Sequence, residues 1–93
     1  MEIKNLYKVK EKYIKITDSI AIKKWNTDPP KVIIACTGLS TKKHLTPLGS
    51  IKARGLELRY TCDTCRLKID FDAMSLIMGT ALLTYPEVFN KEN

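Results

Sequence analysis

Three cysteines and one histidine are the residues of this chain with the most specific chemistry. Cys62 and Cys65 are separated by two residues in the stretch "RYTCDTCRLKID". Two thiolates at this spacing can bind one tetrahedral zinc ion, which then needs two further ligands. Cys36 and His44 are the candidates of suitable type. The sequence therefore predicts a zinc site whose ligands are Cys36, His44, Cys62 and Cys65.

The stretch around the cysteine pair resembles one half of a zinc ribbon. The similarity covers six residues, "YTCDTC". The other half departs from that pattern, because seven residues separate Cys36 from His44 and no glycine follows Cys65. The resemblance implies a metal-bound turn at the two thiols. An alternative zinc arrangement is a dimer that shares one ion between two copies of Cys62 and Cys65.

Two other roles for the thiols are compatible with the sequence. If a helix began directly after Cys65, the order strand, Cys-x-x-Cys, helix would match the local layout of thioredoxin-like proteins. The helix N-terminus would then lower the pKa of Cys62, which would attack, and Cys65 would resolve. This arrangement predicts redox or sulfur-transfer chemistry. In the remaining alternative the thiols only pack in the protein and have no chemical role. A framework of disulfides is not expected, because three cysteines cannot all form pairs.

The elements before the thiols are predicted from a proline break at "NTDPP", which cannot continue a helix. Ahead of it, branched residues and a Thr-Asp-Ser turn favour strands over about 5–16 and 20–25. Directly after it, "KVIIAC" predicts a buried strand over 31–36. "TGLSTKKHL" is then expected to be a loop in which Gly38 takes a positive φ.

A short helix is predicted for "TPLGSIKARG". Thr46 suits the N-cap, Pro47 the first helical position, and Gly55 the place beyond the end. Basic residues in its last turn favour the helix dipole. The prediction therefore places a basic helix between the loop and the thiols.

The chain around and after the thiols is predicted to form a hairpin and a final helix. Alternation over 56–60 indicates a strand that leads into Cys62, and "RLKIDF" favours a returning strand over 66–71, with the Cys-x-x-Cys step at the tip. The alternative is that 66–71 begins the helix. Asp70 and Asp72 suit the cap of a helix over about 73–84. This helix is apolar on most of its circumference, so the sheet or a second copy of the chain is expected to cover it.

Positive charge is concentrated before residue 69. Residues 1–68 contain 15 of the 16 Lys and Arg but six of the ten acids, which gives +9, whereas residues 69–93 carry −3. Clustered basic side chains favour a polyanion through counterion release, and Trp25 and the tyrosines could stack on bases. The predicted nucleic-acid-binding residues are Lys42, Lys43, Lys52, Arg54, Arg59 and Arg66.

Together these features predict a small α+β protein with an antiparallel sheet. The chain is expected to be one domain over 1–93, with a basic β-rich segment at 1–26, a core at 31–85 and a tail at 86–93. It has neither a membrane-spanning apolar run nor a signal-peptide pattern, so a cytoplasmic protein is expected. No hydrolase-like set of residues is present.

The predicted function is that of a non-catalytic basic binding module, stabilised by zinc, that contacts nucleic acid. One alternative is a thiol redox or sulfur-transfer protein that uses Cys62 and Cys65. Another is an interaction or assembly subunit that forms a homodimer through residues 73–84.

Overall fold

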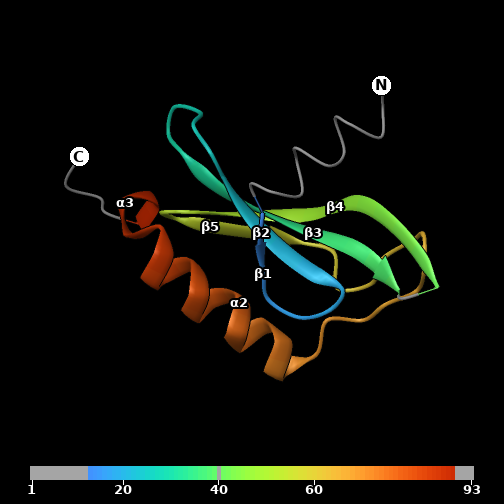
Figure 1. The fold of residues 1–93 in the computed structure, drawn as a ribbon. Coiled ribbons are helices and arrows are strands. Elements are labelled where there is room, and N and C mark those ends of the chain that lie inside the picture. The colour runs from blue at the N-terminus through green and yellow to red at the C-terminus, as the bar shows by residue number, and fades with distance from the viewer. Residues whose placement is uncertain (1–12, 40, 90–93) are drawn as a thin grey trace.

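Within residues 13–39 and 41–89, which the computed structural model describes, the chain forms one antiparallel sheet of five strands. The strands are adjacent in sequence order: β1 (Ile14–Lys15), β2 (Ile20–Trp25), β3 (Lys31–Leu39), β4 (Lys42–Lys52) and β5 (Gly55–Leu58). The helices α2 (Phe71–Thr84) and α3 (Pro86–Phe89) follow the sheet, and α2 runs along one of its faces (Figure 1). The expected small domain with an antiparallel sheet and a helix is confirmed.

β2 and β3 form where the sequence predicts strands. They pair without interruption from Ile20 opposite Cys36 to Trp25 opposite Lys31, and the segment "NTDPP" connects them. β3 continues beyond the predicted end to Leu39. Of the strand predicted over 5–16, β1 contains Ile14 and Lys15. Residues 5–12 of that prediction lie outside the described residues.

The loop predicted over 37–45 and the helix predicted over 46–55 are wrong, because β3 and β4 extend through most of both segments. Pro47 lies within β4 opposite Ala35, beside a register shift between Ile34 and Ala35. A β-bulge of this kind is one of the few places where a sheet accepts proline. The helix signals at 46–55 are local, and pairing along the whole of β4 with β3 outweighs them.

Two glycines allow β4 to approach its neighbours. Gly38 has a φ of 95°, as predicted, and a Cβ there would lie 2.4 Å from the carbonyl oxygen of Lys42. A Cβ on Gly49 would lie 1.9 Å from the carbonyl oxygen of Glu57. Gly49, which weakens a helix, is therefore required where β5 crosses close to β4.

The segment between β5 and α2 is mostly irregular. Its one isolated antiparallel bridge joins Thr61 and Lys68, and no strand extends over 66–71. The N–H of Cys62 donates to the carbonyl of Leu67 at 2.8 Å. Asp70 caps α2 by accepting from the N–H of Ala73, so the helix begins at Phe71 rather than near 73. The predicted returning strand is therefore reduced to a single bridge.

The core lies between one face of the sheet and α2. It consists mainly of Ile20 and Ile22 from β2, Val32 and Ile34 from β3, Leu48 and Ile51 from β4, and Ile77, Ala81 and Val88 from the helices. Cys36 and Cys62 belong to the same buried cluster. These two thiols are therefore part of the hydrophobic core.

Among the described residues, no helix has the length and apolar character needed to cross a membrane.

Candidate metal centre

Cys36, His44, Cys62 and Cys65 converge on one point. Their potential ligand atoms all lie within 4.8 Å of one another. Cys36 comes from β3 and His44 from β4, while both other thiols come from the turn after β5. Cys36 and Cys62 are fully buried, and His44 and Cys65 are partly exposed. The four residues that the sequence predicts as ligands are close enough to hold a metal ion.

Two distances within the cluster are close to those of tetrahedral coordination. Cys36 Sγ lies 3.6 Å from Cys65 Sγ and 3.8 Å from His44 Nε2. In a tetrahedral zinc site with Zn–S bonds of about 2.3 Å and Zn–N bonds of about 2.0 Å, the sulfur atoms are about 3.8 Å apart and sulfur and nitrogen about 3.6 Å apart. All three cysteines are free thiols. An ion can therefore fit between these atoms with little rearrangement.

Strand pairing explains why His44 faces the thiols. Thr46 lies directly opposite Cys36 in the β3–β4 register, and His44, two residues earlier, projects from the same face of β4. The hydroxyl of Thr46 is 2.9 Å from His44 Nδ1 and 3.2 Å from the hydroxyl of Thr64. A partner on Nδ1 fixes the orientation of the ring and leaves Nε2 as the ligand atom.

The turn between the two nearby cysteines is closed by the backbone of Arg66. Its N–H donates to the carbonyl of Cys62 at 2.8 Å, and its φ of 67° lies in the left-handed region. Glycine is the residue that adopts this conformation most easily. The zinc-ribbon pattern has glycine at this position. The backbone after Cys65 thus has the conformation that a glycine would favour, although the side chain is that of arginine.

The thiols differ in their acidity. Burial and, to a smaller extent, hydrogen bonding to the thiols of Cys65 and Cys62 together raise the pKa of Cys36 to about 12, although a backbone hydrogen bond at Gly38 acts in the opposite direction. Burial also opposes ionisation of Cys62, but the backbone N–H groups of Cys65 and Thr64 outweigh it and lower the pKa of that thiol. A divalent cation binds thiolates and displaces their protons. Such an ion would supply the positive charge that this buried cluster lacks.

The two thiols are not arranged as in the thioredoxin-like layout. α2 begins at Phe71, so its N-terminus does not follow Cys65 directly. Cys62, the expected nucleophile in that layout, is fully buried. A redox cysteine needs access to its reaction partner. The geometry favours metal ligation over exchange chemistry.

The six residues predicted to bind nucleic acid are not gathered on one surface. Lys43 and Lys52 lie on the sheet face opposite α2, because a register shift in the β3–β4 ladder changes the alternation along β4, but they are nine residues apart, or about 30 Å. Lys42 points to the other side of the strand, and Arg54 lies in the β4–β5 turn. Arg59 pairs with Asp63 at 2.9 Å. Arg66 lies in the thiol turn, as described above.

Three lysines that sequence reasoning missed share the face of Lys43 and Lys52. Lys15 lies opposite Ala21 and Lys23 opposite Ile33, while Lys31 lies opposite Trp25. Alternation along the strands places these side chains on the sheet face away from α2. The lysine face is accordingly defined by Lys15, Lys23, Lys31, Lys43 and Lys52. The period of two in "IAIKKW" was the signal that could have identified it.

Comparison with protein-family models, curated proteins and solved structures finds no match to this chain. No relative therefore supplies a function. The chain's own residues provide a cluster of three cysteines and one histidine that lie close enough together to hold a metal ion.

Proposed function

We propose that this protein is a non-catalytic, zinc-stabilised module that contacts nucleic acid. The observation that supports it most strongly is the convergence of three thiols and one imidazole within 4.8 Å. Thiolate and imidazole ligands suit zinc, and four protein ligands complete a tetrahedral shell. A closed shell has no position for a substrate or a reactive water. The zinc is therefore structural.

The position of the cluster explains what the zinc would stabilise. It joins β3 and β4 to the turn after β5, and that turn has little regular pairing of its own beyond the bridge between Thr61 and Lys68. A turn through Asp63 and Thr64 is unfavourable by itself, because tight hairpin turns favour positive φ and threonine is β-branched. Zinc would hold the Cys-x-x-Cys segment as the tip of a short hairpin.

The nucleic-acid part of the proposal rests on charge. The chain has a formal net charge of +6, and five lysines project from the face of the sheet that lies away from α2. Contacts between lysines and phosphates release counterions, so they favour nucleic acid and weaken steeply as salt rises. The absence of an open metal position agrees with binding rather than catalysis.

Native mass spectrometry of untagged protein, with and without a chelator, tests the metal centre. We expect one zinc ion per chain, lost in Cys62→Ser and kept in Ser75→Ala, a change at an exposed position of α2. Full zinc retention in Cys62→Ser contradicts the proposed ligands. Half a zinc per chain would instead support a site shared between two copies.

A second candidate function is assembly through α2. Phe71 and Leu83 are 83% and 86% exposed, and Leu76 and Leu82 are also exposed. Apolar side chains in this number on one helix are typical of a protein contact. We propose a homodimer through residues 73–84 as the alternative. The same mass spectra test it, because a monomer mass at every protein concentration would contradict the dimer.

A further inference from the structure

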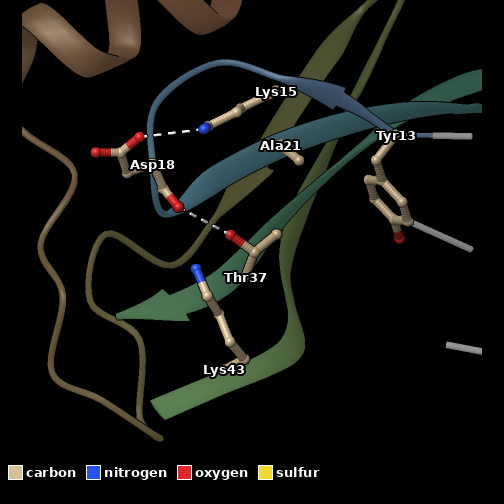
Figure 2. Close-up of a pocket in the computed structure, with 6 residues that line it drawn as sticks. All are labelled: Tyr13, Lys15, Asp18, Ala21, Thr37 and Lys43. Carbon is tan, nitrogen blue, oxygen red and sulfur yellow. Dashed lines mark hydrogen bonds and ion pairs between the residues drawn. The ribbon is translucent and has the colours of Figure 1, made fainter. Parts of the chain in front are cut away.

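A hollow on the lysine face has the size and lining of a small binding site. Tyr13, Lys15, Asp18, Ala21, Thr37 and Lys43 surround it (Figure 2). Its volume is about 200 Å³. Pockets for drug-sized ligands have volumes of about 300–1,000 Å³. This hollow is smaller than such a pocket, so it is suited to one phosphate group with a base at its edge.

The floor and walls of the hollow come from strands β1 to β4 and from the turn between β1 and β2. Ala21 of β2 forms the floor, because its side chain is small, and Thr37 of β3 lies beside it (Figure 2). The Nζ atom of Lys15 is 3.2 Å from the carboxylate of Asp18. Lys43 approaches from β4 and forms no ion pair with a described residue. Two ammonium groups thus border the space, one of them held by a carboxylate.

Hydroxyl groups add donors and acceptors to the two charges. The Thr37 hydroxyl donates to the backbone carbonyl of Asp18 at 3.3 Å and keeps its own lone pairs. Burial raises the pKa of Tyr13 above its ordinary value, and the protonated phenol can donate a hydrogen bond at neutral pH. The Tyr13 ring stands at one end of the hollow (Figure 2). The lining thus combines positive charge with an aromatic ring.

We propose that this hollow binds one nucleotide unit of a single-stranded nucleic acid, with the phosphate between Lys15 and Lys43 and the base against Tyr13. The inference rests on the proposed nucleic-acid function and assigns that function to a site. Single-strand binders commonly combine a basic track for the backbone with aromatic rings for the bases. A duplex keeps its bases stacked and would offer only its backbone.

Elsewhere on the lysine face, lysine side chains also lie beside aromatic rings. The Nζ atom of Lys23 lies 5.8 Å from the centroid of the Tyr13 ring, and that of Lys31 lies 5.5 Å from the Trp25 ring. Trp25 is also half exposed, at 44%. A strand that leaves the hollow along β2 would meet a second lysine–aromatic pair. Trp25 fluorescence therefore reports directly on binding beyond the hollow.

Binding of labelled oligonucleotides to the intact, zinc-loaded chain tests the inference. Fluorescence anisotropy is measured with single-stranded DNA, single-stranded RNA and duplex DNA at about 50 and 200 mM salt. We expect Lys43→Gln to weaken single-strand binding several-fold and to reduce the salt slope by about 0.7. Lys42→Gln, the neighbouring residue on the other side of β4, is the matched control and should change neither value.

The aromatic contribution is tested with Tyr13→Leu. Loss of base stacking should weaken single-strand binding roughly tenfold. Tyr60→Leu, a change at an exposed tyrosine outside the hollow, should leave the affinity unchanged. Zinc content and circular dichroism of each variant establish that the fold is retained. A folded Tyr13→Leu variant with undiminished affinity overturns the base contact.

Other outcomes separate this inference from the proposed function. Equal losses in Lys43→Gln and Lys42→Gln would overturn the hollow but keep nucleic-acid binding. Duplex binding as tight as single-strand binding, with the same dependence on Lys43, would overturn the single-strand assignment. Binding of inorganic phosphate that no oligonucleotide displaces would overturn it in favour of a small phosphate ligand. No binding of any nucleic acid at low salt would overturn the proposed function as well.

Discussion

Thr46 is held between the imidazole of His44 and the hydroxyl of Thr64. The Thr46 oxygen lies 2.9 Å from His44 Nδ1 and 3.2 Å from the Thr64 oxygen, so the three groups form one series of hydrogen bonds. The two threonine hydroxyls connect β4 to the thiol turn, and neither of them is a candidate metal ligand. Groups that hydrogen-bond a ligating imidazole set its tautomer and its orientation. Thr46 is thus a positioning residue of the metal centre.

Thr46→Val should weaken zinc binding by about 10–100-fold while one ion per chain is still bound at saturation. Valine keeps the shape of threonine but offers no partner to His44 Nδ1. Competition with a chromogenic chelator measures the change in affinity.

Thr64→Val and Thr41→Val are the matched controls for this prediction. Thr64→Val removes only the outer hydroxyl of the series, so its effect should be smaller than that of Thr46→Val. Thr41 is exposed between β3 and β4, and its replacement should have no effect. If Thr46→Val binds zinc as tightly as the unchanged protein, the hydroxyl does not position the imidazole.

The four residues of the candidate metal site could be predicted from their types, whereas their geometry could not. Three thiols and one imidazole in a short chain leave few combinations. The register that places Thr46 opposite Cys36 depends on β4, which the sequence suggested was a loop and a helix. The dispersal of the six basic residues could not be predicted for the same reason. A loop followed by a helix would bring Lys42 and Lys52 together, but a strand keeps them far apart.

At the scale of elements, β2 and β3 were predictable and β4 was not. In β2 and β3, on either side of the double proline, branched apolar residues favour the extended conformation locally. The pairing of the two strands favours the same conformation, so local and tertiary preferences agree. In β4, Thr46, Pro47 and Gly55 provide local helix signals, and only the pairing partners on both sides override them. Alternation over 56–60 indicated the strand that became β5. The sequence did not indicate that 66–71 pairs so little, because that pairing depends on the conformation of the thiol turn.

Gly49→Ala should destabilise the protein by about 1–3 kcal/mol, because the new methyl group would overlap the backbone of Glu57 and push β5 from β4. Gly79→Ala is a matched change, since a Cβ there meets no atom within 4 Å. In the middle of α2 it should stabilise by about 0.5–1 kcal/mol. Urea denaturation of zinc-loaded protein measures both. Equal effects of the two changes would contradict the close approach of β5.

At the scale of the whole molecule, the two sides of the sheet differ in chemistry. The lysine face carries positive charge, and the other face is covered by α2, whose own outer surface includes exposed Phe71 and Leu83. The charge is also divided along the chain, because both helices lie in the described part of the acidic residues 69–93 and the sheet lies in the described part of the basic residues 1–68. The two sides of the sheet therefore differ in charge and in apolar exposure, and the proposed nucleic-acid contact belongs to the lysine face.

The metal centre lies where these two sides are joined, since the thiol turn leads from the sheet into α2. Without zinc, the turn is held by few backbone hydrogen bonds, among them Cys62 N–H to Leu67 and Ile69 N–H to Tyr60, each at 2.8 Å. Opening of a segment with so few bonds costs much less free energy than opening of the paired β2–β3 ladder. Chelation should therefore accelerate amide hydrogen exchange first at 61–70 and then in α2.

Hydrogen exchange followed by mass spectrometry measures this order, with Cys62→Ser as a metal-free reference and Ser75→Ala as the control. The β2 and β3 amides should remain protected at chelator concentrations that release 61–70, because their core residues Ile22 and Ile34 are fully buried. Simultaneous loss of protection throughout the chain would show that zinc supports the entire fold rather than the junction. Unchanged exchange at 61–70 after zinc removal would contradict a structural metal at this turn.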